Sequence, residues 1–196
     1  MSTVPYQLNL PDHASDAEIL AQVKRALREA DQAPALLMTG SFAGAVADAK
    51  AHGETIGLLT DASIPVFALP SSIIETRGVS LLLAADRVIL GPESEISSAW
   101  RTSPGLAALL HHKFGPVLAR AITFDASKDL LARLVEYGHA VRASEADALA
   151  QEMAVNLGDG MGRRFKRAFK AAAELPLKEA IRFDLWCDAS RKASSS

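Results

Sequence analysis

Residues 65–99 read PVFALPSSIIETRGVSLLLAADRVILGPESEISSA, and this stretch carries the strongest structural signal in the chain. PVFAL (65–69) and RVIL (87–90) are short apolar runs of the kind that forms interior strands. Between them, GVSLLLAAD (78–86) has the composition of a buried helix, and a Gly-Pro turn signal follows the second strand. Parallel strands joined by a helix bury both faces of their sheet, which requires such nearly continuous apolar runs. The sequence therefore predicts an α/β protein.

The remainder of the chain is predicted to be mainly helical. In the first half, strands are expected at YQLNL (6–10) and ALLM (35–38), with helices over 17–31, capped by Ser15 or Asp16, and over 45–60. In the second half, helices are expected over 103–115, 116–124, 127–137, 145–158 with Ser144 as the N-cap, 163–174 and 177–189, with a short extended piece at 139–141. The glycine-rich run at 158–162 is expected to end a helix, because it follows no strand and lacks the lysine and hydroxyl of a phosphate loop.

Composition is that of a compact protein with a single core. The 196 residues are 49% hydrophobic, with a mean hydropathy of +0.12, which is enough apolar material for one core and a helical appendage. The net charge of −2 gives no general attraction to nucleic acid. Cys187 is the single cysteine, which excludes an internal disulfide and suits a reducing compartment. No secretory or membrane-length apolar segment is evident, so we expect a cytoplasmic protein with no nucleic-acid or membrane partner.

Residues 65–86 resemble the core motif of the crotonase (enoyl-CoA hydratase/isomerase) superfamily, PVIAAVNGxALGGGxELALACD, which aligns with them without a gap. Three flanking segments agree in order and spacing. LLMTGSFAG (36–44) is similar to the family's VLTGxGxxFCAG, residues 119–143 are similar to AxxLxLTGxxxxAxEAxxxGLVxxV, and residues 174–189 look like the closing helix that begins around LPLxEGLxxE. The resemblance covers nearly the whole chain and implies a crotonase-like ββα spiral core.

The resemblance also implies a domain organisation. Residues 1–142 would form the spiral core, including helices within 104–137, and residues 143–196 would form a C-terminal helical region for oligomerisation. Members of this family typically use those last helices for trimer contacts, so a homo-oligomer, either a trimer or a hexamer, is expected. The region at 45–60 is shorter than the family segment that contributes to the coenzyme A pocket.

An oxyanion hole, in which two backbone N–H groups polarise a thioester carbonyl, is the main functional feature that the resemblance implies. One N–H maps near Ala43 and Gly44, and the other maps onto Arg77, with Gly78 beside it. The family has three consecutive glycines here, whereas this chain has Thr76, Arg77 and Gly78. Because a side chain at residue 77 fills or lines the space that the acyl group approaches, we expect a hole of altered form.

The two glutamates that hydratases of this family use as general acid and base are absent. Their positions map onto Ser80 and Trp100, and neither side chain moves a proton as a carboxylate does. Ordinary enoyl-CoA hydratase activity is therefore not expected. Some crotonases work with one acid or none and use the oxyanion hole to hold an enolate, as lyases or isomerases.

Two functions from different classes follow. The first is an atypical crotonase that binds an acyl thioester, linked to coenzyme A or a carrier protein, and stabilises an enolate through Ala43, Gly44, Arg77 and Gly78, in specialised metabolism. The second is a non-catalytic crotonase-fold partner or activator subunit of another enzyme. Coenzyme A thioester enters only as a substrate, with no tightly bound cofactor and no metal. A pocket beside Arg77 wide enough for a thioester would favour the first function, and a pocket filled by side chains would favour the second.

Other candidate residues carry weaker signals. His111 and His112 are adjacent on a helix and point about 100° apart, so they form no metal pair of the i,i+4 kind. Arg77 is expected either to pair with Glu75 or to bind an anionic group of a ligand. A basic helix face is formed by Arg163, Lys166, Arg167 and Lys170, and it is interpreted as a solvated face or as a contact for the nucleotide end of coenzyme A.

Overall fold

The computed structural model describes residues 4–125, 129–158 and 160–194, with side chains as far as Cys187. Within these residues a parallel five-stranded sheet has the order β1-β2-β3-β5-β7. The strands are β1 (Tyr6–Leu10), β2 (Leu36–Gly40), β3 (Val66–Ala68), β4 (Ile73–Ile74), β5 (Arg87–Leu90), β6 (Glu95–Ile96) and β7 (Ala140–Arg142). The helices are α1 (Asp16–Glu29), η1 (Ala30–Gln32), α2 (Ala49–Asp61), α3 (Thr76–Ala84), η2 (Ser98–Thr102), α4 (Leu106–Phe124), α5 (Leu130–Glu136), α6 (Ala146–Asn156), α7 (Met161–Glu174) and α8 (Leu177–Ser194).

Residues 65–90 include a strand, a helix and a second strand, as expected. β3, α3 and β5 follow one another, and β5 pairs in parallel with β3 through Phe67 opposite Arg87 and Ala68 opposite Val88. Helices also connect β1 to β2 and β2 to β3. The α/β class is confirmed, because every pair in the main sheet is parallel.

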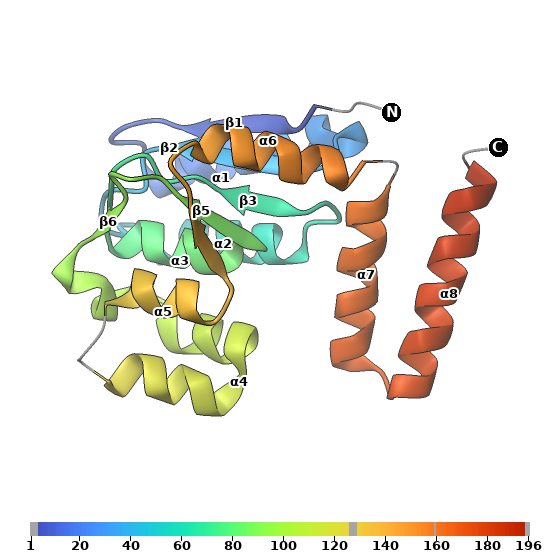
Figure 1. Cartoon of the computed structure of the whole chain (residues 1–196). Coiled ribbons are helices and arrows are strands. Elements are labelled where there is room, and N and C mark those ends of the chain that lie inside the picture. The colour runs from blue at the N-terminus through green and yellow to red at the C-terminus, as the bar shows by residue number, and fades with distance from the viewer. Residues whose placement is uncertain (1–3, 126–128, 159, 195–196) are drawn as a thin grey trace.

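Each face of the sheet packs against its own hydrophobic cluster. Side chains alternate along a strand, so Leu36 and Met38 of β2 join the larger cluster, which α1, α3 and α4 complete, whereas Leu37 points to the opposite face. On that opposite face, Ala150 and Ala154 of α6 pack over Leu37 and its neighbours. In Figure 1, α6 crosses the sheet on one side while α1, α2 and α3 lie on the other.

Helix α3 is the central element of the core, because every residue from Arg77 to Ala84 is buried. The carbonyl groups at its C-terminal end are bonded by side chains from elsewhere in the chain. His139 donates from Nε2 to the Leu82 carbonyl at 3.1 Å, and the Lys113 ammonium donates to the Ala85 carbonyl at 2.8 Å. A carbonyl accepts only, so the neutral His139 ring carries its hydrogen on Nε2. These bonds fix the helix against α4 and the start of β7.

Helix ends agree with the sequence in some places and differ in others. Ser15 caps α1 in a capping box with Glu18, as expected for one of the two candidate caps. Ser144 does not cap α6, since Glu145 holds the N-cap position and no side chain bonds the first turn. The break expected between helices at 103–115 and 116–124 is confirmed, because Gly115 within α4 has non-helical backbone angles (φ 72°, ψ 172°) just before Pro116. The expected helix start at Ser127 lies outside the described residues.

A second, two-stranded parallel sheet was not expected from the sequence. It pairs β4 with β6 through Ile73 opposite Glu95 and Ile74 opposite Ile96. The short helix η2 follows directly, and it packs against α3. These elements place Trp100 beside the central helix.

The last two helices form a hairpin that projects from the layered body, and we call α7 and α8 the arm (Figure 1). By contrast, α6 belongs to the body, because it covers the second face of the sheet. The division at residue 143 into a core region and an oligomerisation region therefore stays a prediction. The structure places α6, near the start of the second region, in a layer of the core. No helix in the described residues is both long and apolar enough to cross a membrane.

Candidate functional site

The two backbone segments that were expected to form an oxyanion hole do lie side by side. The loop after β2 contacts the N-terminal end of α3 through two backbone hydrogen bonds. The Glu75 N–H donates to the Phe42 carbonyl, and the Arg77 N–H donates to the Gly44 carbonyl, both at 3.1 Å. The fold therefore brings residues 43, 44, 77 and 78 together, as the alignment predicted.

The close contact depends on two glycines. A Cβ atom on Gly78 would lie 2.0 Å from the Phe42 carbonyl oxygen, so only glycine allows the helix to approach the loop this closely. Gly44 has φ of +100°, and a Cβ there would lie 2.9 Å from Nη2 of Arg77. Gly78 is thus the one residue of the family's triple glycine that this chain retains, and the packing requires it.

The N–H groups that would polarise a carbonyl already have acceptors in this chain. The Gly44 N–H donates to Oε2 of Glu75, and the Ala43 N–H lies 3.4 Å from the Ser41 hydroxyl oxygen. The Arg77 N–H, as described, donates to the Gly44 carbonyl. A negatively charged oxygen of the protein therefore occupies the place on Gly44 where the family pattern would put a substrate oxygen.

The Arg77 side chain is buried in the same region and is bonded from three directions. Its guanidinium donates to the Ala14 carbonyl at 2.6 Å and to the Ala43 carbonyl at 2.7 Å. Nη1 also lies 3.8 Å from Oδ1 of Asp16, in an ion pair whose two side chains are almost fully buried. The ion pair that was considered between Arg77 and Glu75 is not the one formed, because Asp16 takes the role of the carboxylate. The guanidinium fills the space beside Gly44.

Asp16 and His52 complete this buried polar cluster. Oδ2 of Asp16 accepts the N–H groups of Ala47 and Asp48, both at 2.8 Å, and so fixes the segment that leads into α2. Within the described residues, Oδ1 of Asp16 and Nε2 of His52 form no hydrogen bond. Burial lowers the pKa of His52, Asp16 opposes this shift, and Arg77 adds to it. The ring is therefore held in its neutral form.

Ser80 lies on α3 three residues after Arg77, Trp100 lies on η2, which packs against α3, and neither side chain offers an acid. The Ser80 hydroxyl is fully buried and donates to the Pro104 carbonyl at 2.7 Å. The Trp100 side chain is buried, and the Arg101 guanidinium lies 4.4 Å from the centre of its ring. Within the described residues, no group of three or more His, Cys, Asp or Glu side chains is placed to hold a metal ion.

The sequence located the backbone of this site and indicated that Arg77 fills or lines it, but it identified neither Asp16 as the partner of Arg77 nor Glu75 as the acceptor of the Gly44 N–H. Asp16 is 61 positions before Arg77, and Glu75 acts on a glycine 31 positions away, so no local pattern links them. The available signal was indirect: an arginine at the start of an otherwise apolar helix predicted to be buried implies a buried acceptor for its charge.

Comparison with known proteins identifies the architecture. No family model matches the sequence, and no curated protein matches it. Solved structures do match: an enoyl-CoA hydratase from Bacillus anthracis has a TM-score of 0.71 at 18% identity, covering 96% of this chain and 88% of that one. This chain has the crotonase fold.

Two further crotonase-fold structures give the same result. An enoyl-CoA hydratase from Polaromonas sp. JS666 has a TM-score of 0.69 at 19% identity and covers 96% of this chain and 86% of its own. An enoyl-CoA hydratase/isomerase from Xanthobacter autotrophicus Py2 has a TM-score of 0.67 at 20% identity, with coverages of 95% and 85%. The crotonase fold expected from residues 65–86 is confirmed, at a level of identity that shows the fold alone.

Proposed function

We propose that this chain is a crotonase superfamily member that works by association with other protein chains and carries out no thioester chemistry at the family's catalytic position. One observation supports this most directly: the Gly44 and Arg77 N–H groups both donate to oxygens of this chain. Of the two functions expected from the sequence, this is the non-catalytic partner or activator subunit.

Loss of these donors would remove most of the catalytic power of such a site. An oxyanion hole works because its donors are free and already aimed at the oxygen that gains charge, and one donor is worth about 10²–10³ in rate. Here a substrate carbonyl would have to displace the Glu75 carboxylate from Gly44 and separate Arg77 from Gly44. General acid-base catalysis would contribute nothing further, because Ser80 and Trp100 stand where the family pattern has its two glutamates.

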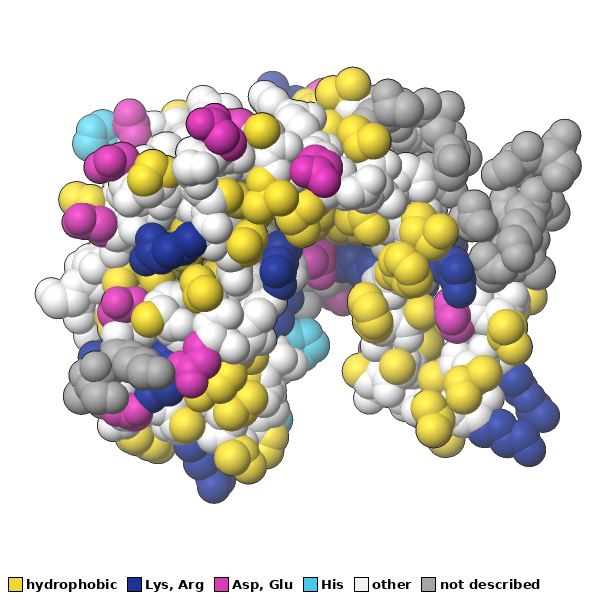
Figure 2. All heavy atoms as spheres, viewed as in Figure 1, with side chains coloured by type: hydrophobic (Ala, Val, Ile, Leu, Met, Phe, Trp, Pro, Cys, Tyr) yellow, Lys and Arg dark blue, Asp and Glu magenta, His cyan; other side chains and the backbone are white. Residues whose placement is uncertain are grey.

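The surface of the arm supports the proposal that this chain associates with other protein chains. Large apolar side chains are exposed along α8, among them Leu177 (75% exposed), Leu185 (64%) and Ile181 (52%). Figure 2 shows hydrophobic side chains gathered on this arm, which projects from the body. Exposed apolar area of this kind marks a surface that another protein covers. We propose a homo-oligomer, either a trimer or a hexamer, or a hetero-complex with a partner enzyme.

The direct test is calorimetric titration of the purified protein with crotonyl-CoA, butyryl-CoA and an acyl carrier thioester, together with an absorbance assay for hydration of crotonyl-CoA. We expect no heat of binding with any thioester and no turnover. Saturable binding of a thioester by the natural chain would overturn the proposal.

A variant that opens the site shows whether its side chains are what excludes the thioester. Glu75→Ala frees the Gly44 N–H, and Arg77→Gly removes the guanidinium and restores the family glycine. We expect the double variant, where circular dichroism shows it folded, to bind crotonyl-CoA more tightly than the natural chain. Glu93→Ala, a substitution of another glutamate outside the site, is the control and should gain nothing.

The thioester-binding enzyme is the second candidate, and one observation favours it. The Gly44 and Arg77 segments lie side by side, and a rotation of the Glu75 side chain, which is only partly buried, would free the Gly44 N–H, with the Arg77 N–H still bonded to the Gly44 carbonyl. In that case the substrate would be an acyl thioester of coenzyme A or of a carrier protein, and the chemistry would be enolate stabilisation without a carboxylate acid. The titration above separates the two functions.

A further inference from the structure

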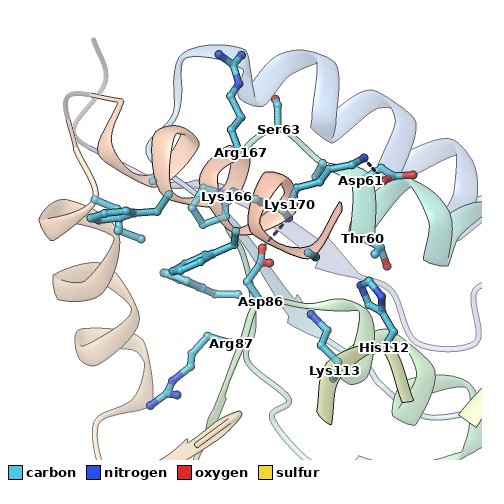
Figure 3. Close-up of a pocket in the computed structure, with 18 of the residues that line it drawn as sticks. Thr60, Asp61, Ser63, Asp86, Arg87, His112, Lys113, Lys166, Arg167 and Lys170 are labelled. Carbon is cyan, nitrogen blue, oxygen red and sulfur yellow. Dashed lines mark hydrogen bonds and ion pairs between the residues drawn. The ribbon is translucent and has the colours of Figure 1, made fainter. Parts of the chain in front are cut away.

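A groove of about 900 Å³ lies between α7 and the body, away from the cluster around Arg77. Its body wall comes from the segment before β3, the start of β5 and helix α4, as Figure 3 shows. β3 and β5 begin at this groove, whereas the Gly44 and Glu75 segments follow the ends of β2 and β3. The groove therefore lies at the N-terminal ends of the parallel strands, and the candidate oxyanion hole lies at their C-terminal ends.

The groove has apolar walls. On α7, the rings of Phe165 and Phe169 are stacked with 6.3 Å between their centres, and their side chains are 40% and 73% exposed. Pro65, Phe67 and Leu157 also line the groove from the body. A cavity of a few hundred to about a thousand Å³ with mainly apolar walls is the usual form of a small-molecule site.

The basic groups in the groove differ in how many of their donors are used. An ammonium has three N–H donors. Lys166 uses all three, on Asp86 at 2.7 Å and on the carbonyls of Ile64 and Leu59 at 3.2 and 3.4 Å. Lys113 donates only to the Ala85 carbonyl and forms no ion pair within the described residues. Lys113 therefore has donors left for another acceptor.

The charge around Lys113 is unbalanced. Two ammonium groups, Lys113 and Lys166, flank a single carboxylate, Asp86, which also accepts the Val66 N–H at 2.8 Å. In Figure 3, Lys113 and His112 extend from α4 toward α7 and into the groove. Burial lowers the pKa of Lys113, Lys166 lowers it further, and Asp86 opposes the shift. The negative charge of an added anion would offset the cost of desolvating Lys113 and the repulsion from Lys166.

We propose that this groove binds an organic anion, with its apolar body against the stacked rings of Phe165 and Phe169 and its anionic head on the free donors of Lys113. The ligand class is a carboxylate with an apolar chain or ring, because one ammonium with two spare donors matches one carboxylate head. A phosphate of high charge fits less well, since Asp86 lies beside the head position. This site does not depend on the proposed function.

The test uses decanoate, below its micelle concentration, as the probe in calorimetric titration of the natural chain. Acetate carries the head without the body, and decan-1-ol carries the body without the anion. We expect saturable binding of decanoate, and binding of acetate and decan-1-ol at least tenfold weaker. Equal binding of decanoate and decan-1-ol, or no saturable decanoate binding at millimolar concentration, would overturn the assignment.

Variants locate the site. Lys113→Met removes the charge while keeping a straight side chain, and we expect at least a tenfold loss of decanoate affinity. Lys113→Arg should retain most of it, and Phe169→Ala, at an exposed position, should lose several-fold. Lys50→Met is the matched control, because Lys50 is an exposed lysine outside the groove, and it should bind as the natural chain does.

Three other outcomes of these measurements each have a defined meaning for the groove. If Lys113→Met fails to fold by circular dichroism, Lys113→Arg and Phe169→Ala still carry the comparison. Unchanged affinity in Phe169→Ala together with equal loss in Lys50→Met would place binding elsewhere on the surface. If light scattering shows an oligomer that Phe169→Ala dissociates, and decanoate binds to neither form, the groove is an interface between copies and the ligand site is excluded.

Discussion

Gly78 occupies the point where α3 passes closest to the loop after β2. Because a Cβ there would meet a backbone oxygen at 2.0 Å, relief requires movement of the loop or of the helix, both of which are packed in the core. We expect Gly78→Ala to lower the free energy of unfolding by about 1–3 kcal/mol or more, measured by urea denaturation.

Gly53→Ala is the matched control for that substitution. Gly53 lies within α2, and no atom lies within 4 Å of a Cβ built there. The same change should therefore raise stability by about 0.5–1 kcal/mol, because alanine restricts the unfolded chain and favours helix. Equal changes in the free energy of unfolding at both positions would show that close contact with the Phe42 carbonyl does not require glycine at position 78.

His139 makes stability depend on pH in a defined range. Burial lowers its pKa to about 4, and the neighbouring Lys113 adds to that shift. The unfolded ring titrates near 6.5, so the folded state is favoured fully above about pH 6.5 and loses this contribution as the pH falls toward 4. The loss is about 3 kcal/mol.

The pH effect can be assigned to this residue by substitution. His139→Gln keeps an N–H donor for the Leu82 carbonyl but does not titrate, so its stability should fall less between pH 7 and 4 than that of the natural chain. His111→Gln, at an exposed position, should leave the dependence unchanged. Urea denaturation at several pH values measures both, and parallel curves for the natural chain and His139→Gln would contradict the assignment.

At the scale of single residues, the sequence located the backbone of the candidate site and the arginine that fills it, and missed the groups that bind this arginine. Gly44, Arg77 and Gly78 could be aligned because a family pattern records positions along the chain. The acceptors of Arg77 come from Asp16 and Ala14. Such a pairing depends on how α1 docks against the loop, which no local spacing encodes.

Asp86 connects three elements through one carboxylate. Its Oδ2 accepts the Val66 N–H at the start of β3 and the Lys166 ammonium of α7, at 2.8 and 2.7 Å. We expect Asp86→Asn to cost about 1–3 kcal/mol, the usual penalty for a lost charged hydrogen-bond partner, and to loosen α7 from the body.

Asp61→Asn is the matched control for Asp86→Asn. Asp61 also pairs with a lysine of α7, Lys170, at 2.9 Å, but both side chains are largely exposed. Exposed ion pairs contribute little, so this variant should unfold at the same urea concentration as the natural chain. Limited proteolysis of the arm gives a second readout for both variants, and equal cleavage rates would show that Asp86 does not hold α7.

Element by element, segments with a continuous apolar run or a helical period were predicted well, and the two-residue strands were not. β1, α1, β2, β3, α3 and β5 lie where apolar patterning placed them, within a few residues at their ends. β4 and β6 have two residues each, which is too few to show an alternating pattern. Their pairing also joins Ile73 to Glu95, residues that are far apart in the sequence. The cap of α6 was misplaced by one residue, because Ser144 is a common cap and Glu145 is not.

At the scale of the whole molecule, α8 carries an apolar stripe. Leu177, Ile181 and Leu185 recur at every fourth residue and are 75%, 52% and 64% exposed. We expect the natural chain to be an oligomer in light scattering, with a mass three or six times that of the chain. Ile181→Glu should convert it to smaller species, because burying a charge on this stripe is costly.

Glu179→Lys is the control for this charge substitution, since Glu179 is exposed on the same helix and, two residues before Ile181, lies on the side opposite the stripe. It should leave the oligomer intact. A natural chain that is monomeric at all concentrations tested would contradict the proposed oligomer. The sequence predicted helices in this region, but an amphipathic helix reads the same whether its apolar side faces the body or a neighbouring chain.

The two ends of α3 are bonded to different parts of the body, its N-terminal amides to the loop after β2 and its C-terminal carbonyls to His139 and Lys113. Its amide hydrogens should therefore exchange with deuterium only when the whole molecule unfolds, while those of α7 and α8 exchange through local opening. We expect this division to let the projecting hairpin rearrange around a bound protein without transmitting motion to the interior.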